Sequence, residues 1–390
     1  RLSERKIKLK KKHIRVKHQK VKLFRANEPL LSVFMWGVNH TINELSHVTI
    51  PVMLLPDDFR AYSKLKVDNH LFNKENMPSH FKVKEYCPLV FRNLRERFGI
   101  DDLDYKESLT RSQPIPDESS GKSGAKFYQS YDRLFILKTL TSEEVERMHS
   151  FLKHYHPYIV ERHGKTLLPQ YLGMYRLTVD GIEHYLVATR NVFSNHLNIH
   201  RKYDLKGSTV DREASEKELE KDLPTLKDND FIKQGVRVDI GEAAKEKLLE
   251  TLTADVEFLT KLHLMDYSLL LGVHECGRGE AEYLSINAAR YRWGWNTPPD
   301  SPRALTRQHS FRYTGIIPDL DIYAIPSAVK KEIYFVALID VLTHYGVKKQ
   351  AAKAAKTVKY GSNVDGISTC DPDQYGKRFI EFVAKAIEGN

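Results

Sequence analysis

The chain has 390 residues, of which 41% are hydrophobic and 10% aromatic, enough to build a sizeable core as one large domain or two lobes and too many for a disordered chain. Its net charge of +10 points to an anionic partner, but does not distinguish nucleic acid from phospholipid or from a role in solubility alone. No apolar run approaches the roughly 18 residues of a membrane span, and the basic start lacks the apolar core of a signal peptide. Three cysteines without metal-ligand spacing argue against a disulfide framework or a zinc site. We therefore expect a soluble cytoplasmic protein.

Basic residues are concentrated in two segments. Residues 1–25 carry twelve Lys or Arg and one acid, and residues 348–359 carry five lysines and no acid. Each basic residue near an anionic leaflet is worth about 1 kcal/mol, so both segments suit an anionic membrane surface, with a solvated tail as the alternative for residues 1–20. Nucleic acid is not expected, because no nucleic-acid-binding module is recognisable and the basic runs lack interleaved aromatic residues.

The first predicted helix covers residues 85–98. Pro88 suits its first turn, apolar residues recur at helical spacing through Leu94, and Gly99 supplies a stop. Residues 104–125 are rich in Ser, Pro, Gly and charge. They are therefore expected to form a loop.

A β-hairpin and a helix follow. Residues 126–130 and the apolar run 134–140 predict two antiparallel strands. Thr141 and Glu144 then form a capping box that opens a helix. We expect that helix to end at Pro157, because proline lacks the backbone donor that a helix interior needs.

A second hairpin and a long helix lie further along the chain. Residues 171–179 and 182–189 flank Asp180-Gly181, a strong hairpin signal, so the sheet should be largely antiparallel. Residues 213–230 are dense in charge and are expected to form an exposed connector. Leucine and valine recur at helical spacing over residues 248–262, which predicts an amphipathic helix.

The last third of the chain places two aspartates beside regular elements. Asp266 follows the long helix directly, and Asp340 ends the buried-strand pattern of residues 332–339. Between them, residues 275–320 show no periodicity and are interpreted as a mobile insert.

The first candidate for chemistry is a lysine on a strand. Gly121-Lys122-Ser123-Gly124 is not a Walker A loop, because Pro116 stands where that loop needs a glycine. A glycine loop followed by a lysine on the next strand is typical of kinases, and Lys138 has that place. Locally, Lys138 could equally protect an edge strand from aggregation.

The two aspartates are the other candidates. Asp266 could orient or deprotonate an attacking hydroxyl, and Asp340 could hold Mg²⁺ against nucleotide phosphates. A local helix-to-loop hydrogen bond for Asp266 and a strand-end turn for Asp340 are the alternatives. The order of glycine loop, strand lysine, helix, hairpin and the two aspartates favours the kinase interpretation.

Several segments resemble signatures of the phosphatidylinositol phosphate kinases, over nearly the whole chain from residue 20. They are Trp36-Gly-Val-Asn-His40, Asp68-Asn-His-Leu-Phe72, Phe91-Arg-Asn-Leu-Arg-Glu-Arg-Phe98, Tyr203-Asp-Leu-Lys-Gly-Ser-Thr209, Met265-Asp-Tyr-Ser-Leu-Leu270 and Phe335-Val-Ala-Leu-Ile-Asp340. The resemblance implies an α+β, two-lobed kinase-like fold, with a largely antiparallel sheet in the N-terminal lobe and a smaller C-terminal lobe. The implied catalytic domain is residues 26–390, divided near residue 190 into the two lobes.

The resemblance also implies roles for individual residues. Lys138 would contact nucleotide phosphates, Asp266 would be catalytic and Asp340 would bind Mg²⁺ and nucleotide. Protein kinases place an asparagine five residues after the catalytic aspartate, whereas this chain has Leu271, so its metal binding should differ in detail. The acid that pairs with Lys138 could be Glu144 or Glu146.

The remaining implied site residues lie in three segments. The stretch Thr189-Arg190-Asn191-Val192-Phe193 is similar to the family's interlobe hinge, which lines the purine site. Lys202 would lie at the nucleotide, and Lys206 and Arg212 would contact the substrate phosphate groups. As bare sequence, His200–Arg212 could equally be a solvated basic strand and turn.

Substrate choice in this family resides largely in the activation segment, here within residues 344–366. Where kinases that phosphorylate phosphatidylinositol 4-phosphate carry glutamate, this chain has Ala352. The segment is similar to that of the type II enzymes, which phosphorylate phosphatidylinositol 5-phosphate at the 4-hydroxyl. The alternatives are a weakly active phosphoinositide-binding scaffold and a phosphatidylinositol 4-phosphate 5-kinase.

The resemblance finally implies donor, assembly and place of action. ATP would be the phosphate donor, and Thr189 with Phe193 resembles isoforms that also accept GTP. A homodimer, or a heterodimer with related isoforms, is expected through the amino-terminal region. The protein would work peripherally at plasma or endolysosomal membranes from the cytoplasm, with the nucleus as a further location.

Overall fold

The computed structural model describes residues 24, 26–68, 77–117, 124–293, 315–344 and 371–387. The chain divides into two compact units, residues 1–156 with 171–190 as unit 1 and residues 157–170 with 191–390 as unit 2. Most of the basic segment, the residues Gly121–Ser123, and the activation segment after residue 344 with Ala352 lie outside the described residues. Within the described part, no helix is both long and apolar enough to span a membrane.

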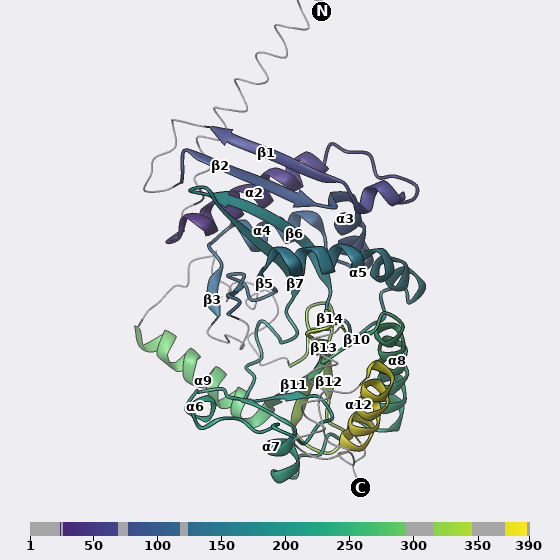
Figure 1. Ribbon diagram of the computed structural model, residues 1–390. Helices are drawn as coiled ribbons and strands as arrows, with labels where there is room; N and C mark the ends of the chain where they lie inside the picture. Colours follow the sequence, from purple (N-terminus) through teal and green to yellow (C-terminus); the bar gives the residue numbers. More distant parts are fainter. Residues whose placement is uncertain are drawn as a thin grey trace, which may run out of the picture. The chain divides into compact units, whose positions relative to one another are not determined.

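Unit 1 contains a seven-stranded sheet in which every neighbouring pair is antiparallel (Figure 1). In spatial order its strands are β1 (Tyr62–Asp68), β2 (His80–Tyr86), β6 (Tyr171–Val179), β7 (Ile182–Arg190), β5 (Phe135–Leu140), β4 (Phe127–Gln129) and β3 (Ile115–Asp117). The turn between β6 and β7 has φ values of 51° at Asp180 and 76° at Gly181, as a two-residue hairpin turn with two positive φ angles requires. The predicted hairpins and the largely antiparallel sheet are confirmed.

The helices of unit 1 are α2 (Pro29–Leu45), the short 3₁₀ helix η1 (Pro56–Phe59), α3 (Pro88–Arg97), α4 (Asp102–Thr110) and α5, which begins at Ser142. Helix α5 begins at the capping box predicted from the sequence. The amide of Thr141 donates to the Glu144 carboxylate and the amide of Glu144 donates to the Thr141 hydroxyl, each at 3.2 Å. The predicted end at Pro157 is wrong, since α5 continues to Glu161. Tertiary packing holds the extra turn, in which Ile159 is fully buried.

Two helices of unit 1 were not expected from the sequence. α4 occupies the start of the predicted loop 104–125, where the Asp101 side chain caps it by accepting the amides of Leu103 at 2.8 Å and Asp104 at 3.2 Å. α2 is buried on all sides from Leu31 to Val38. A helix of that kind lacks the amphipathic stripe that marks a surface helix in a sequence.

Unit 2 contains a five-stranded sheet and a two-stranded one. The larger sheet has the order β12 (Ala324–Pro326), β13 (Glu332–Ile339), β11 (Ser268–Glu275), β8 (Arg201–Leu205) and β9 (Thr225–Leu226), and the smaller one pairs β10 (Leu264–Met265) with β14 (Thr343–His344). The helices are α6 (Glu216–Leu219), α7 (Asp228–Lys233), α8 (Glu242–Lys261), α9 (Cys276–Trp293) and α12 (Pro372–Ile387). α12 packs along α8, as Figure 1 shows.

Unit 2 corrects three expectations. The predicted exposed connector 213–230 contains α6, β9 and the start of α7, and its Asp228 is fully buried. The predicted insert 275–320 begins with α9, which gives no helical periodicity because its Leu284 and Ile286 are exposed rather than aligned on a core face. The expected smaller C-terminal lobe holds for the main sheet, five strands against seven, but not for the length of chain.

The segment 157–170 belongs to unit 2 although the chain on both sides of it belongs to unit 1. The buried Asp255 carboxylate of α8 holds it, accepting the Tyr158 hydroxyl at 2.6 Å, the Thr166 hydroxyl at 2.7 Å and the Leu167 amide at 2.6 Å. Burial raises the pKa of Asp255 to about 6, against the lowering effect of these hydrogen bonds. This carboxylate thus ties the inserted segment to the core of unit 2.

Candidate active site

Asp266 and Asp340 lie at a break in the pairing of two chain segments in unit 2. Strands β11 and β13 pair as far as Ser268 opposite Ile339, and pairing resumes between β10 and β14 at Met265 opposite Thr343. Residues 266–267 and 340–342 lie between these two ladders. The two ladders therefore place two aspartates that are distant in the sequence on adjacent chain segments.

Both aspartates have a left-handed backbone, with φ of 61° at Asp266 and 58° at Asp340. Aspartate tolerates this conformation better than most residues, but it still costs free energy, and such strain is concentrated at functional sites. Asp340 is exposed and Asp266 is partly exposed. The carboxylates are therefore accessible at a point where the backbone is held in an uncommon conformation.

Helix α12 fixes the backbone beside Asp266. The Tyr375 hydroxyl donates to the Tyr267 carbonyl at 2.5 Å, and the fully buried Tyr267 ring packs edge-on against Tyr375 and Phe379. Burial, with the negative charge of Asp266 as the next cause, raises the pKa of Tyr375 well above its usual range. The tyrosine is therefore a neutral hydrogen-bond donor that anchors the Asp266 loop.

A divalent cation would fit Asp340 as one of its ligands. Mg²⁺ usually takes one or two carboxylates and completes its shell with phosphate oxygens and water. Among the residues that the structure describes, no three His, Cys, Asp or Glu side chains form a cluster, so most other ligands would come from the nucleotide and water. Leu271, at the position where protein kinases have a second metal ligand, is buried in β11.

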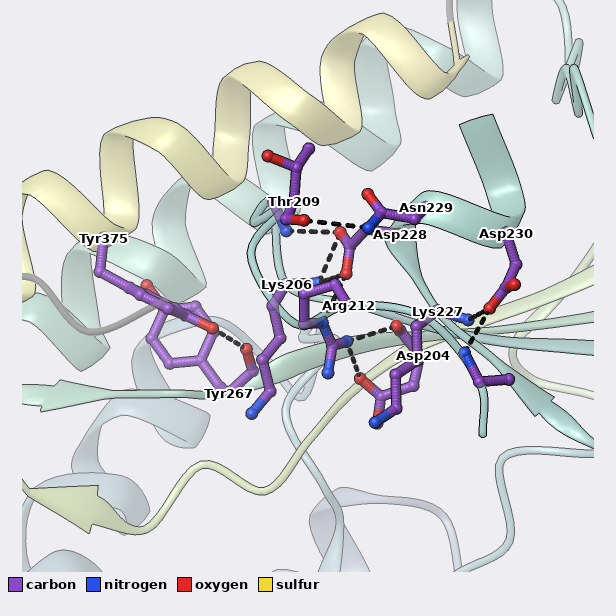
Figure 2. Close-up of polar contacts among 12 residues, drawn as sticks. Asp204, Lys206, Thr209, Arg212, Lys227, Asp228, Asn229, Asp230, Tyr267 and Tyr375 are labelled. Atoms are coloured by element: carbon purple, nitrogen blue, oxygen red, sulfur yellow. Dashed lines mark hydrogen bonds and ion pairs between the residues drawn. The ribbon is translucent and has the colours of Figure 1, made fainter. Parts of the chain in front are cut away.

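The turn after β8 carries Lys206 and Arg212, two of the three basic residues predicted at the nucleotide and substrate (Figure 2). Lys202 lies within β8, paired with Gly272 and Thr225. Arg212 is only 7% exposed; its Nε donates to Asp228 at 2.7 Å and its Nη2 to the Asp204 carboxylate at 2.9 Å. Arg212 is thus held inside unit 2 by two carboxylates.

Asp228 holds the turn that carries Lys206 and Arg212, a role that the sequence did not reveal. Its carboxylate accepts the Arg212 guanidinium and the backbone amides of Lys206 at 3.1 Å and Gly207 at 2.9 Å. A signal existed, because Asp228 and Asp230 stand in the first turn of α7, a frequent place for acids near a helix start. Because residues 213–230 are dense in charge, the sequence did not indicate that Asp228 is buried.

In unit 1, Lys138 lies on an interior strand. β5 is flanked by β7 and β4, where Lys138 pairs with Val187 and Phe127. The edge-strand interpretation of Lys138 is therefore wrong. Its ammonium lies 5.8 Å from the centroid of the Phe127 ring, within cation–π range. Glu144, one of the two expected partner acids, accepts the Thr141 amide at the start of α5.

The predicted hinge residues span the boundary of the two units. Thr189 and Arg190 end β7 in unit 1, whereas Asn191, Val192 and Phe193 begin the second part of unit 2. The Asn191 side chain accepts the Phe193 amide at 3.1 Å. The Phe193 ring covers Gly272 so closely that a Cβ at that glycine would lie 2.5 Å from the ring.

Comparison with known proteins gives a consistent result. Residues 108–386 match the family model described as phosphatidylinositol-4-phosphate 5-kinase. The chain is 60% identical over 390 residues to human phosphatidylinositol 5-phosphate 4-kinase type-2 alpha, covering 97% of this chain and 95% of the relative. The rat type-2 alpha protein is 60% identical over 392 residues (97% and 95%), and the mouse type-2 beta protein is 59% identical over 386 residues (95% and 92%).

Proposed function

The chain belongs to the phosphatidylinositol phosphate kinase family, and we propose that it transfers the γ-phosphate of ATP to the 4-hydroxyl of phosphatidylinositol 5-phosphate. The product is phosphatidylinositol 4,5-bisphosphate. The observation that carries the proposal is the position of Asp266 and Asp340 on adjacent chain segments, between two ladders of unit 2. The substrate assignment is supported by relatives of about 60% identity that are named phosphatidylinositol 5-phosphate 4-kinases.

Asp266 and Asp340 would divide the work at the reacting centre. Asp266 orients the 4-hydroxyl and accepts its proton as the new oxygen–phosphorus bond forms and ADP leaves. Asp340 would hold Mg²⁺, whose positive charge would offset that of the nucleotide phosphates. Both residues have a left-handed backbone, an uncommon conformation of the kind that is concentrated at functional sites.

The remaining site residues bind the two substrates. Lys138 and Lys202 contact nucleotide phosphates, and the stretch Thr189–Phe193 lines the purine. Lys206, Arg212 and the segment around Ala352 face the phosphorylated headgroup. The support is the position of Lys138 on an interior strand and of Lys206 and Arg212 on one rigid turn.

GTP is proposed as a second donor. The Thr189 hydroxyl would pair with a guanine edge, and Phe193 would pack on the base. Initial rates at equal ATP and GTP test this, with Thr189→Val as the variant, because valine keeps the branched shape and removes the hydroxyl. A near-total preference for ATP in the wild type would refute the use of GTP as a second donor.

We propose a homodimer, or a heterodimer with related isoforms, that binds an anionic membrane from the cytoplasm or nucleus. Strand β1 supports this, since it ends the order of the unit 1 sheet and an edge strand presents backbone groups to a partner. Residues 1–25 and 348–359 supply positive charge. Sedimentation at several protein concentrations and vesicle flotation at rising salt would measure both properties.

A lipid kinase assay tests the central proposal. The protein is incubated with labelled ATP, Mg²⁺ and vesicles carrying each monophosphorylated phosphatidylinositol, with Asp266→Asn as the inactive control. The 5-phosphate lipid should be labelled best. A preference for the 4-phosphate lipid would reassign the chain to the 5-kinases, and no lipid product would favour a phosphoinositide-binding scaffold.

A further inference from the structure

Asp228 concentrates an unusual number of contacts on the turn that follows β8. It is fully buried, and its two carboxylate oxygens accept the amide of Lys206, the amide of Gly207 and the Nε of Arg212. All three donors lie within a stretch of seven residues. One carboxylate on α7 therefore fixes the whole turn.

The same carboxylate balances the charge of Arg212. Burial lowers the pKa of Arg212, while Asp204 and Asp228 more than reverse that effect, so its net pKa lies above the usual value. The Nη2 group also donates to the Asp204 carbonyl at 2.6 Å. Arg212 thus stays charged and has one orientation, since a guanidinium held at both ends cannot rotate.

The turn itself is stiff where Asp228 binds it. Gly207 has φ of 76°, and a Cβ there would lie 3.2 Å from the Phe379 Cα of α12. Gly207 therefore combines a backbone conformation that favours glycine, close contact with α12 and a hydrogen bond to Asp228. Figure 2 shows the Lys206 side chain running away from Asp228, with its amine clear of the dashed contacts.

We propose that Asp228 is a positioning residue for phosphate recognition, which holds the backbone of Lys206 and the guanidinium of Arg212 in the orientation that binds the lipid phosphate. The inference rests on the proposed function. Because the turn is fixed before the lipid arrives, binding orders only the end of the lysine side chain, which lowers the entropic cost. A carboxylate is required, because asparagine would replace one of the two acceptor oxygens by an NH₂ group, which would then face the backbone amides or the guanidinium.

The matched pair Asp228→Asn and Asp230→Asn tests the proposal. Asp230 lies on the same helix and accepts two backbone amides, from Lys227 and Ala214 at 2.9 Å each, but neither comes from the turn. Both variants weaken the hydrogen bonds of α7. Only Asp228→Asn should raise the KM for phosphatidylinositol 5-phosphate, by about ten-fold or more, since displacement by an ångström can change rates by about 10²-fold; the KM for ATP should stay within about two-fold.

A double-mutant cycle with Lys206→Ala separates positioning from loss of stability. If Asp228 acts through the turn, Asp228→Asn should raise the lipid KM much less in the Lys206→Ala background than in the wild type. Equal increases in both backgrounds would overturn the part of the proposal in which Asp228 acts through Lys206. So would a normal lipid KM for Lys206→Ala alone, a measurement that stays valid even if Asp228→Asn fails to fold.

A binding measurement distinguishes failure of this inference from failure of the proposed function. Flotation compares vesicles containing phosphatidylinositol 5-phosphate with vesicles of equal charge made with phosphatidylserine. Wild-type protein that makes no lipid product refutes the proposed function. Wild-type protein that makes product, while Asp228→Asn and Asp230→Asn have the same lipid KM and vesicle binding, refutes only the role of Asp228.

Discussion

Replacing Asp266 by asparagine, alanine and glycine in turn would separate its chemical role from its backbone role. Its φ is 61°, so the three substitutions differ in two ways. Asparagine keeps the side-chain shape, tolerates the left-handed backbone and cannot accept a proton at the amide. Alanine removes the carboxylate and is strained in this conformation, whereas glycine removes the carboxylate without that strain.

The expected magnitudes follow from these differences. Loss of a general base lowers turnover by about 10²- to 10⁴-fold, and we expect this for all three variants. The left-handed conformation costs an ordinary residue about 1–2 kcal/mol. The free energy of unfolding should therefore fall by about that amount for alanine only, because asparagine and glycine adopt the conformation readily.

Two assays decide the matter. Phosphate transfer to phosphatidylinositol 5-phosphate in vesicles gives turnover, and urea unfolding gives stability. Asparagine turnover within about ten-fold of the wild type would refute proton acceptance and leave Asp266 as a group that only orients the hydroxyl. An alanine variant as stable as the asparagine variant would refute the assignment of strain to this backbone.

Three further predictions concern stability. Burial raises the pKa of Glu85 to about 7 from 4.5. The protonated side chain therefore contributes its full stability below pH 4.5, and this contribution is lost as the pH rises to 7. Glu85→Gln should reduce the pH dependence of stability, measured by thermal unfolding between pH 5 and 8. The pKa of Asp255 is raised from 3.8 to about 6, so its contribution to the free energy of unfolding also falls as the pH rises from 3.8 to 6. Asp255→Asn should remove the slope and cost about 1–3 kcal/mol in urea unfolding, since an amide cannot accept all three of its donors; unchanged stability would contradict the clamp on segment 157–170. Gly272→Ala should cost about 1–3 kcal/mol because its Cβ would lie 2.5 Å from the Phe193 ring, and a stable variant would show that the ring can move away.

The parts of the fold that local rules govern could be predicted from the sequence. The Asp180-Gly181 turn depends on positive φ at two adjacent residues. The cap depends on two hydrogen bonds between Thr141 and Glu144, which are three residues apart. Neither needs tertiary information. Lys138 could be found by its place after a glycine loop, but only pairing on both sides excluded an edge strand.

The missed features depend on contacts between distant residues. α2 is buried all round and α9 exposes Leu284 and Ile286, so neither shows the one-sided pattern from which helices are read. α5 passes Pro157 because packing outweighs one missing hydrogen bond. Asp228 looked like one acid among many, since its burial arises from a turn twenty residues away.

The insertion of segment 157–170 into unit 2 has a consequence for synthesis on the ribosome. Unit 1 needs β6 and β7, which are made after this segment, and the segment itself must wait for α8 and the Asp255 carboxylate. Until about ninety further residues have been made, the Leu167 amide lacks its acceptor in α8. The two units therefore cannot be separated by cutting the chain once, and a ribosome stalled before α8 would hold a nascent chain whose first unit carries a loop still awaiting its partner.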